Sequence, residues 1–312
     1  VRIMRIACSV VCPGVLLLGE VVMEPSKVTP YFGSVEYPEC HMLYNVTTMA
    51  STWHTVAVKD TRLLRSQLDK VFNLPKEYVF LNYLRCHDDI GWGLDYDYLL
   101  RAGQAEIPHK AFLNAYFQGK YPFSDARGEL YNDDPQLGDA RLCGTTASLT
   151  GIEAAKNEKD AVRLDKSIRL DLMLHAFLLT QRGLPIIYGG DEIGKLNDYS
   201  YHEDPLKRDD SRYLHRGKTD WRKAALRNRP GTVENRIFMG IRKLTDIRKA
   251  YDVFSNDAEC TVIDTENKHV LGISRASGHK KLIALFNFSD SDEIVIIENG
   301  SYRDLYTEDK MA

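Results

Sequence analysis

The chain has 312 residues, of which 44% are hydrophobic and 27% are charged, an ordinary composition for a globular protein with a substantial core. Its net charge of −3 and its scattered lysines and arginines give no basic surface for nucleic acid, and no apolar run is long enough to span a membrane. The six cysteines show no CxxC pair and no Cys/His zinc spacing, so we expect buried thiols that bind no metal.

The first residues have the pattern of a secretory signal, because Arg2 and Arg5 precede an apolar run that ends at Leu18. We reject that interpretation, since the run leads directly into Glu20, a candidate catalytic acid that a removed signal would not carry. Because the chain starts at Val1 rather than Met, we expect it to be a fragment. The sequence does not fix the cellular location, and the cytoplasm is favoured.

The first 90 residues have the pattern of alternating strands and helices. Strands are predicted at 15–18, 42–44 and 78–84, and a helix at 47–68. The 78–84 run is apolar throughout, as expected for a parallel strand that is buried on both faces. Strand, helix and strand at this spacing predict a parallel βαβ unit.

The 78–84 strand breaks into a polar cluster that contains Arg85, His87, Asp88 and Asp89, followed by Trp92. Barrels of parallel strands present catalytic groups at the carboxyl ends of their strands. The alternative is an Asp-rich helix cap. A cap needs only one Asp, however, and two adjacent carboxylates repel each other unless a ligand or cation uses them.

Residues 90–149 lose hydrophobic periodicity, and a loop of this length in a compact domain usually has a function. Its aromatic side chains are suited to packing on sugar rings, but for most of them we prefer a small core of their own. These aromatic residues are Trp92, Tyr96, Tyr98, Phe112, Tyr116, Phe117, Tyr121, Phe123 and Tyr131.

The second half of the chain begins with the clearest helix, at 160–182, followed by a strand at 184–188 and a helix at 233–250. After residue 251 the pattern changes to short alternating runs, which predict a small antiparallel β domain. The runs are 260–263, 269–275, 282–288, 293–297 and 302–306.

Residues 86–92, Cys-His-Asp-Asp-Ile-Gly-Trp, closely resemble the end of barrel strand 7 in the amylosucrase branch of the α-amylase family. Four other stretches agree with this branch in the expected order, and the combination covers nearly the whole chain. They are 19–20, 138–141, 183–194 and 209–216.

The resemblance implies an α/β fold: the C-terminal half of a (β/α)8 TIM barrel, strands 5 to 8, with an insertion after strand 7. Residues 1–89 would hold strands 5 to 7 and their helices, and 90–155 the insertion over the active-site mouth. Residues 156–250 would hold helix 7, strand 8 and helix 8, and 251–312 the antiparallel β domain. No stretch resembles the strand 4 motif, so we expect the nucleophile upstream of Val1 and a chain that is catalytically incomplete alone.

Retaining glycosidases use an acid/base and a nucleophilic carboxylate roughly 5 Å apart. By resemblance, Glu20 is the acid/base, and Asp88 is a third carboxylate that grips the distorted glucosyl ring, with His87 donating to the same ring. Interactions of this kind accelerate the reaction when they strengthen in the transition state. Glu20 alone also fits a surface residue that ends a strand, and Gly19 departs from the small polar residue usual in relatives.

By the same resemblance, Asp89 and Arg141 hold the fructosyl unit, and Arg212 pairs with an acid upstream of the chain to close the pocket behind the glucosyl unit. The planar guanidinium suits both roles, although a surface ion pair is an alternative for either arginine alone. Asn132 stands where relatives commonly have Gln, which leaves the choice between transfer and hydrolysis open.

The predicted function is therefore that of an amylosucrase-like glucosyltransferase, with sucrose and an α-glucan acceptor as partners and no cofactor or metal. It would release fructose from sucrose and pass glucose to an α-1,4-glucan. A sucrose hydrolase or other α-glucosidase on the same scaffold is the first alternative, and a non-catalytic truncated remnant is the second.

Overall fold

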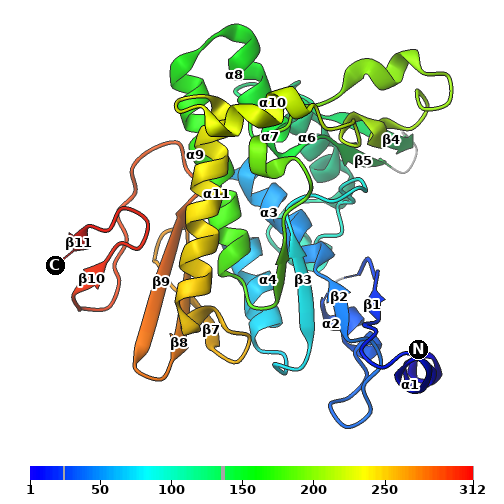
Figure 1. Ribbon diagram of the computed structural model, residues 1–312, viewed down its shortest axis with the longest axis vertical. Coiled ribbons are helices and arrows are strands. Elements are labelled where there is room, and N and C mark those ends of the chain that lie inside the picture. The colour runs from blue at the N-terminus through cyan, green and yellow to red at the C-terminus, as the bar shows by residue number, and fades with distance from the viewer. Residues whose placement is uncertain (24, 135–137, 312) are drawn as a thin grey trace.

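The computed structural model describes residues 1–23, 25–134 and 138–311, and its body is built on a parallel sheet of four strands (Figure 1). The strand order is β1-β2-β3-β6, with Leu18 paired to Met42, Leu43 to Phe80 and Leu81 to Leu184. Since the strands are parallel, their carboxyl ends lie along one edge of the sheet. Their bounds are β1 (Leu18–Gly19), β2 (Met42–Tyr44), β3 (Val79–Tyr83) and β6 (Leu184–Ile186).

These strands confirm the parallel arrangement predicted from the sequence, but most are shorter than expected. The 15–18 strand is reduced to Leu18–Gly19, and the 184–188 strand ends at Ile186. Four helices run beside the sheet, and two of them confirm the helices predicted at 160–182 and 233–250. These helices are α3 (Val46–Val58), α4 (Arg62–Phe72), α9 (Ala161–Thr180) and α11 (Val233–Ala250).

The prediction of a single helix over 47–68 is wrong. Lys59 ends α3 in the left-handed region at φ 58°, and the Asp60 carboxylate then accepts a hydrogen bond from the Arg62 backbone N–H at 3.0 Å. The chain turns at this point, and α4 begins as a separate helix. Periodicity alone did not reveal the break because both helices are apolar on their buried faces.

One hydrophobic core joins the sheet, its helices and the insertion. Trp53 of α3 is fully buried, and its indole N–H donates to the Leu84 carbonyl at 2.9 Å, just beyond β3. The same ring meets Phe117 of the insertion edge to face, with 5.7 Å between centroids. Burying a side chain of this size contributes about 1.5–3 kcal/mol or more, so the segment after β3 is firmly anchored to α3.

The insertion is more regular than its sequence pattern suggested, because short helices and a hairpin replace the expected loop (Figure 1). Most of its aromatic side chains pack together, with Trp92 stacked on Phe117 at 5.8 Å and Tyr116 packed on the same ring, but they belong to the main core and not to a separate core as predicted. Phe123 is fully exposed, and Tyr121 is 46% exposed. The elements are α5 (Tyr96–Arg101), α6 (Glu106–Phe117), β4 (Glu129–Asp134), β5 (Asp139–Cys143) and α7 (Thr146–Leu149).

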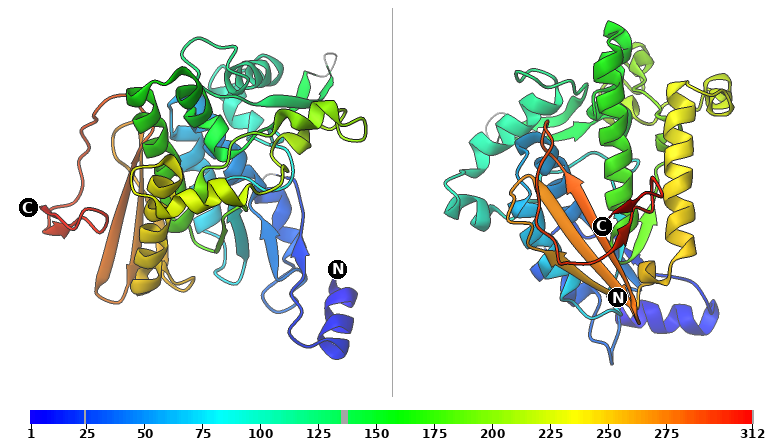
Figure 2. Two further views of the ribbon diagram at one scale, coloured as in Figure 1. Left: turned by 45° about the horizontal axis from the view of Figure 1, so that its top comes forward. Right: turned by 90° about the vertical axis from the view of Figure 1, so that its left-hand side faces the viewer.

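The C-terminal region confirms the predicted antiparallel sheet, with strands β7 (Glu259–Ile263), β8 (Val270–Ser277) and β9 (Lys280–Asn287). The strand predicted at 293–297 is wrong. The run at 302–306 is a strand only at β10 (Tyr302–Arg303), which pairs with β11 (Lys310–Met311) in a hairpin that stands off from the β7–β9 sheet (Figure 2).

The N-terminal helix α1 (Arg2–Val11) buries none of its side chains and lies apart from the other helices (Figure 1). The thiols are not all buried as predicted, since Cys12 is exposed. In the part of the chain that the structure describes, no helix is both long and apolar enough to cross a membrane. The remaining elements are α2 (Pro25–Val28), α8 (Ile152–Glu158), α10 (Trp221–Ala225), η1 (Thr29–Tyr31), η2 (Asp191–Ile193), η3 (Tyr199–Glu203), η4 (Ser211–Leu214), η5 (Leu226–Asn228) and η6 (Asp252–Phe254).

Candidate active site

The carboxyl edge of the parallel sheet gathers the predicted acids. Glu20 directly follows β1, Asp88 follows β3, and Tyr44 ends β2, which lies between those two strands. Burial raises the pKa of the Tyr44 phenol, and nearby Cys86, Glu20 and Asp88 raise it further. Both carboxylates therefore lie near enough to raise the pKa of the same phenol. The rings of Tyr44 and Tyr83 pack edge to face with 5.4 Å between their centroids, so two aromatic side chains lie at the ends of β2 and β3.

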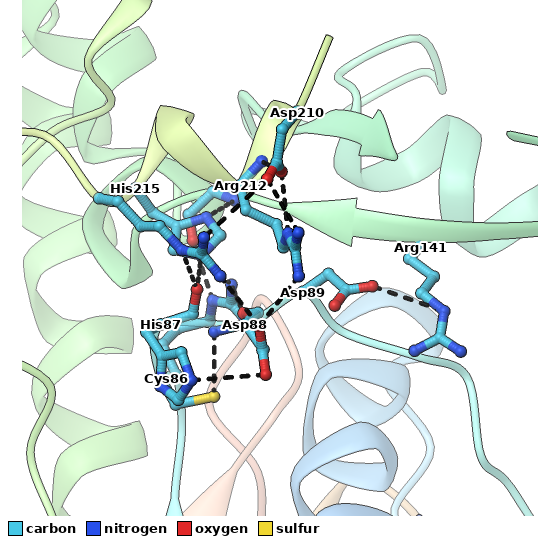
Figure 3. A network of polar contacts seen from close by, with 11 residues as sticks. Cys86, His87, Asp88, Asp89, Arg141, Asp210, Arg212 and His215 are labelled. Carbon is cyan, nitrogen blue, oxygen red and sulfur yellow. Dashed lines mark hydrogen bonds and ion pairs between the residues drawn. The ribbon is translucent and has the colours of Figure 1, made fainter. Parts of the chain in front are cut away.

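The Asp88 carboxylate has different surroundings at its two oxygens. Its Oδ1 accepts a hydrogen bond from Arg216 Nη2 at 2.9 Å and lies 3.4 Å from Arg212 Nη1. Its Oδ2 lies 3.5 Å from His87 Nε2, and the His87 ring is largely exposed (Figure 3). One oxygen is thus held by guanidinium groups, while the other lies beside an exposed imidazole.

Asp89 turns away from Asp88 toward Arg141 of β5 (Figure 3). Its side chain is only 8% exposed, and its Oδ2 lies 3.5 Å from Arg141 Nε. Arg141 lines a cavity of about 410 Å³, whose other walls come from residues 22–23, 27, 91–94, 96–97, 110 and 139. The lining residues are Val22, Met23, Lys27, Gly91, Trp92, Gly93, Leu94, Tyr96, Asp97, Lys110, Asp139 and Arg141.

Arg212 lies in η4, which begins after Asp210. The two residues form a bidentate ion pair, with Nε and Nη2 each donating to a carboxylate oxygen at 2.8 Å, and this pairing raises the pKa of Arg212. The guanidinium also lies over the Tyr131 ring, 4.7 Å from its centroid. Among the described residues, Asp210 and Asp88 are the carboxylates in contact with Arg212. The predicted pairing with an acid upstream of the chain stays a prediction.

Sequence reasoning assigned no role to three residues that support this edge. Arg85 is buried and donates to the Asp88 carbonyl at 2.8 Å and to the Gly144 carbonyl at 2.9 Å. His215 is buried, with Nε2 3.1 Å from the His87 carbonyl, and Arg216 Nε donates to the same carbonyl at 2.6 Å. The arginine and histidine residues of 209–216 indicated a polar site in this loop. Their contact with a segment 128 residues away was not visible in the sequence.

A second polar cluster lies buried beneath the loop after β6. Burial raises the pKa of Asp191 to about 7, and Thr146 donates a hydrogen bond to its carboxylate at 3.0 Å. Burial alone would lower the pKa of His175, but the adjacent Asp171 carboxylate raises it to about 9. Within the described ranges, no group of three or more His, Cys, Asp or Glu side chains is arranged to hold a metal ion.

The parallel sheet gathers acids, an imidazole and guanidinium groups at one edge, and the fold matches that of α-amylase family (β/α)8 barrel proteins. The structure superposes on sucrose 6F-phosphate phosphorylase from Thermoanaerobacter thermosaccharolyticum with a TM-score of 0.65, at 17% identity over 92% of this chain and 51% of that one. For an α-amylase from H. orenii the TM-score is 0.53, at 15% identity over 92% and 46% of the two chains. These likenesses show the fold alone.

In sequence, the chain is 24% identical to glucosylglycerate phosphorylase of Escherichia coli K12 over 312 residues, which are 99% of this chain and 52% of that protein. The chain thus spans about half the length of this curated relative. No family model matches the chain.

Proposed function

We propose that this chain is the C-terminal half of a retaining barrel enzyme of the amylosucrase type, divided into the four segments predicted from the sequence. The complete enzyme would cleave sucrose and transfer glucose to an α-1,4-glucan. The open edges of the sheet support the half-barrel: Leu18 of β1 is 39% exposed and Leu184 of β6 is 47% exposed. Apolar edge strands are normally paired or covered, and four further strands would close this sheet into a barrel.

In the proposed reaction, Glu20 protonates the glycosidic oxygen while a carboxylate from the upstream segment attacks the anomeric carbon. Fructose leaves, and a β-glucosyl–enzyme ester remains. Glu20 then removes the proton from an acceptor hydroxyl, which displaces the carboxylate and restores the α configuration. Asp88 accepts hydrogen bonds from hydroxyls of the glucosyl ring, and these bonds strengthen as the ring flattens in the transition state.

A single observation carries this proposal: Glu20 follows β1 and Asp88 follows β3, and these parallel strands flank β2, so both carboxylates come from the same edge of one sheet, around Tyr44. A glucosyl unit over the Tyr44 and Tyr83 rings would therefore meet both carboxylates. The position of Asp88 Oδ2 beside the exposed His87 ring supports the same placement.

The cavity beside Asp89 supports a neutral sugar as the acceptor. Arg141 is already paired with Asp89, and Lys110 lies 2.8 Å from Glu106 and 3.4 Å from Asp139. Cations with carboxylate partners bind hydroxyl groups well, but they give less attraction to a phosphate than unpaired cations do. We infer that the cavity takes the fructosyl unit and then the acceptor glucan.

Phosphorolysis is the second candidate, because two of the similar proteins are named phosphorylases. The reactions differ only in the acceptor, so products of the complete protein separate them. Sucrose with glycogen would yield a growing α-1,4-glucan and fructose; phosphorolysis would yield glucose 1-phosphate when phosphate is added; hydrolysis would yield equal amounts of glucose and fructose. No turnover of any kind would favour a non-catalytic remnant.

The same assay tests Glu20 directly. Glu20→Gln is expected to remove turnover of sucrose, while Glu36→Gln, which changes an exposed Glu in the loop that follows, is expected to leave it unchanged. Retention of more than a few per cent of activity by Glu20→Gln contradicts the proposal. The coding sequence upstream of Val1 gives an independent check, since it should contain an Arg-x-Asp motif at the end of a strand.

A further inference from the structure

The loop from Asp210 to Arg216 packs against His87 and Asp88, which form the tip of the segment that follows β3. These two segments are 128 residues apart in the chain, yet side chains of one hold both the backbone and the carboxylate of the other. None of the sequence motifs required this contact. It therefore raises the question of what the loop does for Asp88.

Arg216 makes the central contacts of this arrangement. Its Nε donates to the His87 carbonyl at 2.6 Å, and its Nη2 donates to Asp88 Oδ1 at 2.9 Å. A single planar guanidinium thus spans a backbone carbonyl and the carboxylate of the next residue. Because the donors of a guanidinium have a fixed geometry, these bonds set the side-chain angle of Asp88 relative to its own backbone.

Two buried neighbours keep the backbone of the tip in place. His215 Nδ1 accepts a hydrogen bond from the Gly144 N–H at 3.3 Å, so the ring proton sits on Nε2, which faces the His87 carbonyl. Burial, and next the charge of Arg85, lower the pKa of His215 to about 2, which keeps this ring neutral. Arg85 holds the next carbonyl, that of Asp88. The backbone is therefore held by His215 and Arg85 as well as by Arg216, and the further contribution of Arg216 is to the carboxylate.

We propose that Arg216 is the positioning residue of Asp88: by binding Oδ1 it directs Oδ2 toward the glucosyl ring. This inference rests on the proposed function, because it assigns Asp88 to that ring. Arg216 itself does not touch the substrate. Arg212, at 3.4 Å from Oδ1, supplies charge to the same oxygen but is already bound in bidentate fashion by Asp210. It cannot replace the two bonds of Arg216.

Three substitutions in the complete enzyme separate geometry from charge. Arg216→Lys keeps the charge but lacks the fork that reaches both oxygens. Arg216→Gln removes the charge, and Arg216→Ala opens a space for added guanidinium ion. Arg208→Gln is the matched control, because Arg208 is exposed in the preceding part of the same polypeptide segment. Circular dichroism establishes that each variant is folded.

The expected result is a fall in kcat on the order of 10²-fold for all three variants, since a misplaced group loses about that factor, with KM changed less than about threefold. Millimolar guanidinium should restore part of the kcat of Arg216→Ala and leave Arg216→Lys unchanged. A purely structural role would not respond to guanidinium. If Arg216→Ala does not fold, the kcat and KM of Arg216→Lys decide the matter.

Unchanged kcat in Arg216→Lys overturns the inference, as does a rise in KM at constant kcat or the absence of guanidinium rescue in a folded Arg216→Ala. Failure of the proposed function looks different. In that case the parent enzyme transfers no glucose from sucrose, or Glu20→Gln remains active. An inactive Glu20→Gln together with a fully active Arg216→Lys rejects the positioning role alone.

Discussion

The contact between His54 of α3 and His109 of α6 should make the attachment of the insertion sensitive to acid. The two rings lie 5.0 Å apart between centroids, and neither nitrogen of His54 has a hydrogen-bond partner among the described residues. Burial, and next the charge of His109, lower the pKa of His54 from 6.5 to about 3, while Asp60 acts in the opposite direction. The pKa of His109 is also lowered by burial.

The sign of the effect follows from the direction of the shift. Below pH 6.5 the unfolded chain binds a proton at His54 that the folded chain does not, so stability is complete above pH 6.5 and is lost as the pH falls toward 3. At pH 5 the loss from His54 alone is about 2 kcal/mol. Asp191 acts in the opposite sense, because burial raises its pKa to about 7 and its folded form takes up a proton there. Total stability is therefore a poor measure, and a variant must be compared with its parent.

His54→Leu removes the titrating group and keeps the site apolar. Between pH 7.5 and pH 5, the difference in free energy of unfolding should move by about 2 kcal/mol in favour of the variant, or about 1 M in the urea midpoint. Tryptophan fluorescence is the appropriate signal, because Trp53 and Trp92 both contact Phe117 of α6. His279→Leu, at an exposed position, is the control and should show no such shift.

Parallel pH profiles for His54→Leu and its parent would refute this reasoning. They would mean that His54 gains a proton in the folded protein as readily as in the unfolded chain. A shift of equal size in His279→Leu would likewise show that the effect does not come from burial between α3 and α6.

Two further predictions concern stability and are measured by urea unfolding. The buried Arg275 guanidinium donates to the backbone carbonyls of Val253, Thr180 and Ser255, so Arg275→Met should destabilise the protein by about 3 kcal/mol or more. Arg222→Met, at an exposed position, is the control. A loss below about 1 kcal/mol for Arg275→Met, equal to that of the control, would contradict the prediction. Gly183→Ala should cost more than about 2 kcal/mol, because Gly183 has φ +110° and an added Cβ would lie 2.3 Å from the Phe80 carbonyl oxygen. Gly278→Ala is the matched control, because Gly278 has φ +58° and no atom lies within 4 Å of the added Cβ. An equal loss of stability for the two variants would mean that the clash with Phe80 contributes nothing and that backbone strain accounts for the whole cost.

Much of the fold was predictable because its signals are local. The apolar run at 78–84 marked a buried strand, and the periodic pattern at 160–182 marked a helix, since each property repeats within a few residues. The break between α3 and α4 was not predictable in this way. It depends on a left-handed Lys59 and on the Asp60 carboxylate, and the apolar pattern of the residues on either side shows neither.

The insertion and the C-terminal hairpin show the same limit. β4 is mostly polar and has little hydrophobic alternation to detect, and its partner β5 alternates over only four residues. The run at 293–297 is continuously apolar from Ile294 to Ile297, but it is not a strand in the structure. An apolar run forms a strand only where a partner edge is in reach, and partner edges are set by tertiary packing.

The sequence by itself determined which residues end the parallel strands, and therefore that Glu20 and the Asp88–Asp89 pair would share one edge of a sheet. That conclusion needed only the parallel orientation of strands that are joined by helices. The tertiary structure alone decided how those acids are held: Arg216 and His215 reach the His87–Asp88 tip from a loop 128 residues away. Contacts between distant segments form only when helices and strands pack together, so no local pattern in the chain specifies which atoms a side chain will contact.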